Sequence, residues 1–378
     1  MPRTKKKTPA KTTTFPQVGP EEYAARRTAV CAGMDAAGLD ALAVFYSARI
    51  AYLTGFHHIP TERPIVLILG PNEYSALVVP AVEKEHAESV PGIDRVGVYF
   101  EYPGAEHPME LVATKLAEIN AKPRRTGADN DGYAPYWGYR GPLLSDLTGE
   151  RPVDAEMLVE SLRRVKSPTE MECYAPAATE TLFEMVAEMP GWRPRGFNGT
   201  GMEAMFVGGR STAMPHGFVM GHGIQPGDVL VSGAGADIDG YHSELERTMI
   251  VGAPTKEQER AFDAMLALQS RAFEVMAPGV PAGEVELECV QLARELGVEG
   301  SIRHHVGHSI GLEGHEAPFL DRGDDAVLEP GMVFTVEPGV YFQELGGFRH
   351  SDTVVITDSG CRLMTDYPRE LKDLLIPA

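Results

Sequence analysis

The sequence lacks the features of a membrane or secreted protein. No stretch approaches the roughly 18–20 unbroken apolar residues that a membrane-spanning helix needs. The N-terminal residues 1–14 contain no apolar core of the kind found in a secretory signal. The four cysteines lie far apart and form no CxxC pair, which indicates reduced thiols rather than a disulfide framework or a zinc knuckle. We therefore expect a cytoplasmic protein with no membrane partner.

Positive charge is scarce outside the N-terminus. The whole chain of 378 residues has a net charge of −20, yet five basic side chains and no acidic ones lie in residues 1–14. The remaining residues therefore carry about −25, by subtracting 5 from −20. Such a surface repels nucleic acid and anionic membranes. We predict that residues 1–14 form a disordered basic tail and that the protein binds no nucleic acid.

The apolar pattern after the tail predicts an α/β domain over residues 15–156. Strand-like runs at 41–45 and 65–69 alternate with helix-like stretches such as 20–38 and 109–119. No phosphate-binding loop of the GxxxxGK[ST] type or strand-GxGxxG-helix unit occurs in the chain. The alternation therefore indicates a fold but not a nucleotide site.

The second domain, residues 157–378, has a different order of helices and strands. Its expected helices are 168–188, 256–277 and 282–296, and its expected strands are 228–235, 241–250, 331–342 and 352–357. Strands grouped between pairs of helices indicate an α+β domain in which helices cover one face of an antiparallel sheet.

Histidines and carboxylates recur in this domain in short segments bracketed by glycine or proline. These segments are Met-Pro-His216, Tyr241–Thr248, Gly307–Gly311, Gly314–Glu316, Thr335–Gly339 and Gly347–Asp352. Ionisable groups that turns place on a rigid sheet are typical of a catalytic cleft.

These segments resemble the M24 "pita-bread" superfamily, which includes methionine aminopeptidases, Xaa-Pro peptidases, creatinase and ectoine hydrolase. The motifs DGYHSELERT (239–248), GHSIGLEGHEAP (307–318) and LEPGMVFTVEPGVY (328–341) occur in the family's order and at its distances. The resemblance covers about residues 20–370. It implies a pita-bread catalytic domain preceded by a creatinase-type α/β domain.

The resemblance also implies a metal site from which two ligands are missing. In the family's peptidases two metal ions are held by Asp, Asp eleven residues later, His, Glu and Glu. Glu244, His308 and Glu337 match three of these ligands, whereas Gly233 and Ser351 stand at the other two. Because two ions need bridging carboxylates, we expect no dinuclear centre and no cofactor. Glu244, His308 and Glu337 still make a competent open site for a single divalent ion.

The histidine next to Ser351 is not expected to replace the missing glutamate. Neighbouring side chains of a strand point to opposite faces of the sheet. His350 should therefore point away from the cleft.

The segment Leu245–Thr248 resembles creatinase, a metal-free member of the superfamily. Glu246 lies two residues after Glu244, so both side chains should enter the same cleft. In creatinase this glutamate and the one that matches Glu337 bind a guanidinium-like group. An ordinary ion pair between Glu246 and Arg349 is the alternative.

The resemblance implies roles for three more residues. His216 matches the catalytic histidine of creatinase, and His315 matches a histidine that assists peptide-bond attack in peptidases. Arg63 matches an arginine that reaches the partner subunit's site and binds the substrate carboxylate, for which a planar guanidinium is well suited. A salt bridge within its own loop is the alternative for Arg63.

We therefore predict a metal-independent hydrolase of a C–N bond in a small amidine- or guanidine-like zwitterion, similar to ectoine hydrolase or creatinase. In this hypothesis Glu246, Glu337 and Glu244 hold the cationic group, and His216 transfers a proton. Arg63 acts from the other protomer of a homodimer. His308 and His315 complete the expected catalytic set.

Three alternatives belong to other classes. The first is an M24B Xaa-Pro dipeptidase or aminopeptidase with a reduced one-metal site of Glu244, His308 and Glu337, assisted by His216 and His315. The second is a metal-dependent lyase. The third is a non-enzymatic M24-like module that binds a protein partner, which retention of the histidines and glutamates disfavours.

Overall fold

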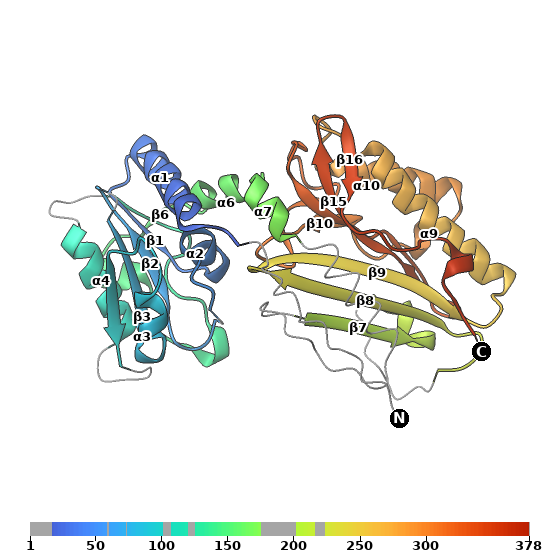
Figure 1. The fold of residues 1–378 in the computed structure, drawn as a ribbon, viewed down its shortest axis with the longest axis horizontal. Helices are drawn as coiled ribbons and strands as arrows, with labels where there is room; N and C mark the ends of the chain where they lie inside the picture. Colours follow the sequence, from blue (N-terminus) through green and yellow to red (C-terminus); the bar gives the residue numbers. More distant parts are fainter. Residues whose placement is uncertain are drawn as a thin grey trace, which may run out of the picture.

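The computed structural model describes residues 17–58, 60–72, 74–100, 107–119, 125–174, 202–215 and 224–377. These residues form two parts, each built around its own sheet (Figure 1). The predicted tail, residues 1–14, and the predicted catalytic His216 lie outside the described residues.

The N-terminal part is an α/β structure around a mixed sheet. Its elements are α1 (Pro20–Ala37), β1 (Ala41–Val44), α2 (Ser47–Thr54), β2 (Val66–Leu69), β3 (Ser75–Pro80), α3 (Lys84–Glu88), β4 (Arg95–Tyr99), α4 (Pro108–Ile119), β5 (Thr126–Ala128), α5 (Leu144–Thr148), β6 (Val153–Asp154) and α6 (Met157–Arg163). In the described residues the strand order is β4-β3-β2-β1-β5-β6. The pairs β1–β2 and β2–β3 are antiparallel, and the other neighbours are parallel.

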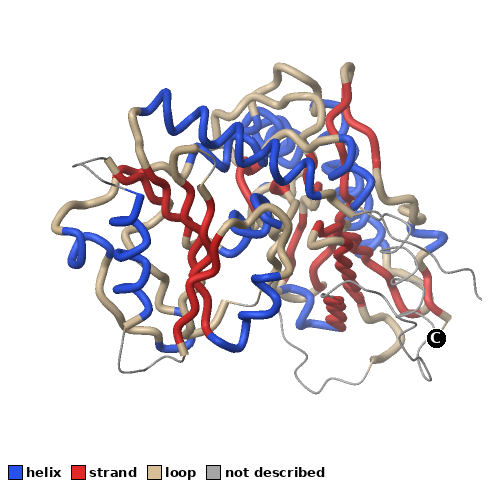
Figure 2. Tube along the Cα trace, turned by 60° about the vertical axis from the view of Figure 1, so that its left-hand side comes forward, coloured by secondary structure: helices blue, strands red, loops and turns tan. Residues whose placement is uncertain are grey.

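Both faces of this sheet are buried, which explains its continuous apolar runs. Successive residues of a strand face opposite sides. Leu42 of β1 packs with Val30 of α1 and Ile50 of α2, whereas Ala43 packs with Val112 of α4 on the other side. Figure 2 shows helices on either side of these strands. The α/β expectation for this part is confirmed.

The C-terminal part is built on a larger sheet. Its elements are α7 (Pro168–Cys173), β7 (Met202–Gly208), β8 (Val229–Ile238), β9 (Tyr241–Val251), α9 (Lys256–Val275), α10 (Ala282–Glu295), β10 (Gly307–Ser309), β11 (Glu316–Leu320), β12 (Val333–Val336), β13 (Gly339–Phe342), β14 (Gly346–Arg349), β15 (Ser351–Thr357), β16 (Gly360–Leu363) and β17 (Leu375–Ile376). The described strands follow the order β11-β10-β12-β15-β9-β8-β7, and all neighbours along this path are antiparallel. The strands β13 and β14 form a separate hairpin.

Two long helices of this part, α9 and α10, pack against its large sheet (Figure 1). Phe262, Met265 and Leu268 of α9 lie in one core with Phe334 of β12 and Val354 of β15. Helices on an antiparallel sheet confirm the α+β expectation. Among the described residues no helix is long and apolar enough to cross a membrane.

One strand predicted from the sequence is interrupted in the structure, and one predicted helix is described only in part. The strand expected over 331–342 is interrupted, because β12 ends at Val336 and β13 begins at Gly339. Pro338 has no N–H for a strand ladder, which accounts for the break and leaves Glu337 on a turn. The helix expected over 168–188 is described only as α7, because its remainder lies outside the described residues.

The connection between the two parts carries charge contacts. The guanidinium of Arg163, at the end of α6, contacts Glu313 at 2.9 Å and Glu316 at 2.6 Å. Lys166 contacts the other oxygen of Glu316 at 2.9 Å. The segment between the sheets therefore holds the loop before β11 in place. The domain boundary between residues 156 and 157 stays a prediction.

A buried ion pair joins β9 to β15. Arg247 and Asp352 are fully buried, and Arg247 Nη2 donates to Asp352 Oδ1 at 2.8 Å. Arg247 also donates to the carbonyl oxygens of Glu246 at 2.8 Å and Ser351 at 3.0 Å. Asp352 accepts a further hydrogen bond from Gln269 of α9 at 2.9 Å. The pair therefore fixes strand register and helix position together.

We expect Asp352→Ala to destabilise the protein by about 3–5 kcal/mol, because it leaves the Arg247 guanidinium buried without its counter-charge. Glu299→Ala is the matched control, since it breaks the exposed Arg294–Glu299 pair, which water and salt screen, and it should destabilise the protein much less. Urea unfolding followed by circular dichroism measures both. Equal shifts of the two midpoints would contradict the central role of the buried pair.

Candidate functional site

The strand alternation of β9 and β15 sorts their side chains between two environments. Glu244 and Glu246 share one face of β9, and Ser351 of β15 lies directly opposite Glu246. His350 points the other way: its ring packs edge-on against Phe262 of α9, with the centroids 5.2 Å apart. The expectation that His350 points away from the cleft is confirmed.

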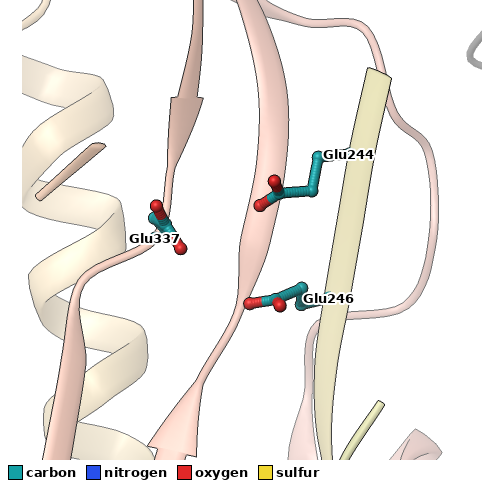
Figure 3. A group of neighbouring side chains, drawn as sticks. All are labelled: Glu244, Glu246 and Glu337. Carbon is teal, nitrogen blue, oxygen red and sulfur yellow. The ribbon is translucent and has the colours of Figure 1, made fainter. Parts of the chain in front are cut away.

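Three carboxylates meet on the face of β9 that carries Glu244. One oxygen from each of Glu244, Glu246 and Glu337 lies within 4.8 Å of the others (Figure 3). Glu337 comes from the turn between β12 and β13, where its N–H donates to the carbonyl oxygen of Val306 at 2.7 Å. The break in the expected strand therefore delivers the third carboxylate of the cluster.

The carboxylates perturb one another's protonation. Burial, together with the charges of Glu337 and Glu246, raises the pKa of Glu244 to about 8. Burial alone would also raise the pKa of Glu337, but the contacts with His308 and Arg349 outweigh it and lower that pKa to about 2. One carboxyl of the cluster thus stays ionised while another resists ionisation. Such a concentration of buried negative charge is relieved by a cation.

His308 supplies a nitrogen to this cluster. Its Nδ1 lies 3.0 Å from the carbonyl oxygen of Ser309, which can only accept, so Nδ1 carries the proton of the neutral ring. The other nitrogen, Nε2, is buried 3.2 Å from Glu337 Oε1, without hydrogen-bond geometry to any described atom. A ring fixed through Nδ1 with a lone pair aimed at carboxylates is typical of a metal-binding histidine.

Arg349 occupies the opposite side of the cluster. Its Nε and Nη2 donate to the two oxygens of Glu246 at 2.5 Å and 2.7 Å, and Nε lies 3.8 Å from Glu337 Oε2. An ion pair with Arg349 was the alternative to substrate binding that the sequence analysis gave for Glu246, and the structure contains this pair. Ser351 Oγ donates to Glu244 Oε1 at 2.7 Å.

His315 stands at the edge of the site. Its exposed ring stacks on that of His308, with centroids 3.7 Å apart and planes 17° apart. It also lines a cavity of about 560 Å³ between the two parts of the chain, together with Tyr46 and Arg49. The neighbouring Glu316 is held by Arg163 and Lys166, so the loop that carries His315 is anchored.

Arg63 forms the salt bridge that was the alternative for it. Its Nη1 lies 2.6 Å from Glu62 Oε1 within the same loop. Two residues near the cluster were missed: His304 Nε2 lies 2.8 Å from the hydroxyl of Tyr341, which lies 3.4 Å from Arg349 Nη1. Tyr341 lies beside Arg349 because β13 pairs with β14 in a hairpin. The sequence analysis predicted one continuous strand over 331–342 and therefore did not predict this hairpin.

The comparisons with known proteins follow the same division of the chain. The family profile described as "Metallopeptidase family M24" matches residues 153–358, and the one described as "Creatinase/Prolidase N-terminal domain" matches residues 26–165. The chain belongs to metallopeptidase family M24.

Its relatives include named dipeptidases. The "Probable dipeptidase PepE" of Mycobacterium tuberculosis is 31% identical over 93% of this chain and 96% of its own length. An "Xaa-Pro dipeptidase" of Pyrococcus horikoshii is 27% identical over 89% of this chain and 96% of its own. The crystal structure of dipeptidase PepE from Mycobacterium ulcerans matches with a TM-score of 0.79 at 26% identity and covers 96% of this chain and 100% of that one.

The prediction of a metal-independent amidine or guanidine hydrolase is wrong, because the relatives are dipeptidases of a metallopeptidase family. The geometry supplies a physical reason. Both oxygens of Glu246 accept hydrogen bonds from Arg349, whose positive charge disfavours a cationic substrate group at the same carboxylate.

The prediction that no cofactor is needed is also wrong, because family membership implies a metal. The donor set fits one divalent ion. Glu244 and Glu337 belong to the carboxylate cluster, and His308 Nε2 lies 3.2 Å from Glu337 Oε1; a histidine with two carboxylates suits Zn, Mn or Fe. The error came from counting lost carboxylates without knowing that a histidine nitrogen lies beside the remaining ones.

The buried His350 gives a pH prediction for stability. Burial, together with the Arg247 charge, lowers its pKa to about 3. The unfolded chain binds a proton at this histidine near pH 6.5 and the folded chain does not, so stability falls as the pH drops below 6.5, by up to about 1.4 kcal/mol per pH unit.

We expect His350→Asn to be less stable than the wild type at pH 7, because it loses packing against Phe262. The difference in stability between the wild type and the variant should be smaller at pH 5, because the variant lacks the group whose protonation favours unfolding. Denaturant midpoints at the two pH values measure it. A constant difference would show that His350 does not titrate in this way.

Proposed function

We propose that the chain is a metal-dependent peptidase that hydrolyses dipeptides with proline in the second position. The observation that carries the proposal is the carboxylate cluster of Glu244, Glu246 and Glu337, with His308 Nε2 3.2 Å from Glu337 Oε1. A relative named Xaa-Pro dipeptidase, similar over nearly its whole length, supplies the substrate class. The cluster and the relatives thus support the same reaction, hydrolysis of a C–N bond.

Glu244, Glu337 and His308 would hold one divalent ion. Bound there, the ion supplies a Lewis acid that polarises a carbonyl group and lowers the pKa of water. The Ser309 carbonyl fixes the orientation of the His308 ring through Nδ1, and Ser351 orients Glu244 through its hydroxyl. The protein therefore contributes a fixed donor set rather than a flexible one.

His315 is the proposed proton carrier among the described residues. Its exposed ring lies against His308 and faces the cavity between the two parts, so it can accept a proton from solvent and deliver it to a leaving nitrogen. His216, which lies outside the described residues, remains proposed as a second catalytic histidine. The anchored Glu316 keeps the His315 loop from drifting away from the site.

We expect a chelator to abolish hydrolysis of Xaa-Pro dipeptides and added Mn²⁺ or Zn²⁺ to restore it. His308→Ala should lower kcat/KM by at least about 100-fold and lower the metal content, because it removes the nitrogen ligand. His86→Ala, at an exposed histidine of α3, is the control and should change neither. The assay follows proline release and elemental analysis of the dialysed protein. Full activity in the chelated enzyme would refute the proposal.

We further propose a cytoplasmic homodimer in which Arg63 of one subunit binds the substrate carboxylate in the other. The Glu62–Arg63 loop is half-buried, so its guanidinium is accessible to a second chain. A planar guanidinium binds carboxylates through two hydrogen bonds. Free dipeptides present such a carboxylate, which gives the loop a function that its local salt bridge does not explain.

Mixing two inactive variants tests the shared site. Arg63→Ala has an intact metal site but lacks the clamp, and His308→Ala has the clamp but lacks the ligand. After equal amounts are unfolded and refolded together, about half of the dimers are mixed and each has one complete site of two, so about a quarter of wild-type activity should return. Activity that stays at the sum of the separate variants would contradict the shared site.

A further inference from the structure

The carboxylate cluster contains a buried salt bridge to which the proposed function assigns no role. Glu246 and Arg349 are both more than nine-tenths buried, and Arg349 engages both oxygens of Glu246. Its Nε also lies 3.8 Å from Glu337 Oε2. The guanidinium is therefore a positive charge, attached to the chain, that touches two of the three carboxylates.

The two described positions beside this pair, Gly233 and Ser351, carry no carboxylate. Gly233 of β8 lies opposite Glu246, and a Cβ atom there would be 2.8 Å from Glu246 Oε1 and 3.0 Å from its Cγ. Glu246 thus fills the space that a side chain at Gly233 would need. On the other flank, Ser351 presents only a hydroxyl, which donates to Glu244.

Charge balance limits how many ions the cluster can hold. With a divalent ion bound, all three carboxylates would be ionised and His308 neutral, and together with the Arg349 guanidinium these groups would carry a net charge of −2. One divalent ion neutralises this charge, whereas two would leave an excess of +2 in a buried site. Donor atoms give the same limit, because both oxygens of Glu246 are already used.

We propose that the Glu246–Arg349 pair replaces a second metal ion, so that the chain binds one divalent ion per subunit at Glu244, His308 and Glu337. The inference rests on the proposed function, because it takes the site to be a metallopeptidase centre. The guanidinium supplies a fixed positive charge beside Glu337 that cannot dissociate and needs no metal supply.

Two substitutions by long unbranched side chains separate charge from packing. Arg349→Met removes the positive charge and frees the Glu246 carboxylate, so the variant should bind a second ion. Arg349→Lys keeps the charge and should still bind one. Arg294→Met, at an exposed salt bridge, is the control and should bind one. The measurement is native mass spectrometry and elemental analysis of dialysed protein titrated with Mn²⁺.

The wild type is expected to bind one Mn²⁺ per subunit. Two ions in the wild type, one ion in folded Arg349→Met, or two ions in Arg349→Lys would overturn the inference. If Arg349→Met does not fold, the wild-type stoichiometry still decides. Because stoichiometry is read without substrate, dipeptide hydrolysis with two ions would overturn this inference alone, whereas one ion without hydrolysis would overturn only the proposed function.

Discussion

The Arg247–Asp352 ion pair is the interaction on which the site depends. It is fully buried between β9 and β15, and its guanidinium also binds the backbone carbonyls of Glu246 and Ser351. These two residues face the carboxylate cluster, so one buried arginine sets the distance between the strands that supply the site. Gln269 extends the same network to α9. Burying this pair costs desolvation free energy, which the full set of hydrogen bonds around it offsets. The pair also defines the register of the two strands.

A second arginine, Arg349 at the end of β14, lies two residues before Ser351 and binds Glu246 in the cluster. Strand alternation separates the two: Asp352 and His350 face the helices, whereas Arg349 and Ser351 face the cluster. The structural network and the functional network therefore share a backbone but not their side chains. This separation allows the residues of the cluster to differ from one family member to another while the sheet beneath them keeps its register.

Much of the architecture could be predicted from the sequence, because it follows from local periodicity. The amphipathic repeat of α9 and the long strand of β9 were placed within a few residues, whereas the ligand role of Glu244, His308 and Glu337 stays a prediction. The role of Glu246 could not be predicted. It depends on the pairing of Ser351 with Glu246, which brings in Arg349 from 103 positions further along the chain. Counting ligands likewise missed the lone pair of His308, since its direction is set by the Ser309 carbonyl.

The ion pairs of Arg163 and Lys166 have a consequence for how this architecture can be divided. Both residues lie in the segment that connects the two sheets, yet they hold Glu316 beside His315. The connector is thus a structural support of the C-terminal part of the chain. Cutting the chain after the first sheet without retaining residues 157–166 would remove that support. The two halves are consequently not interchangeable modules, and recombination between relatives should preserve the connector together with the loop it holds.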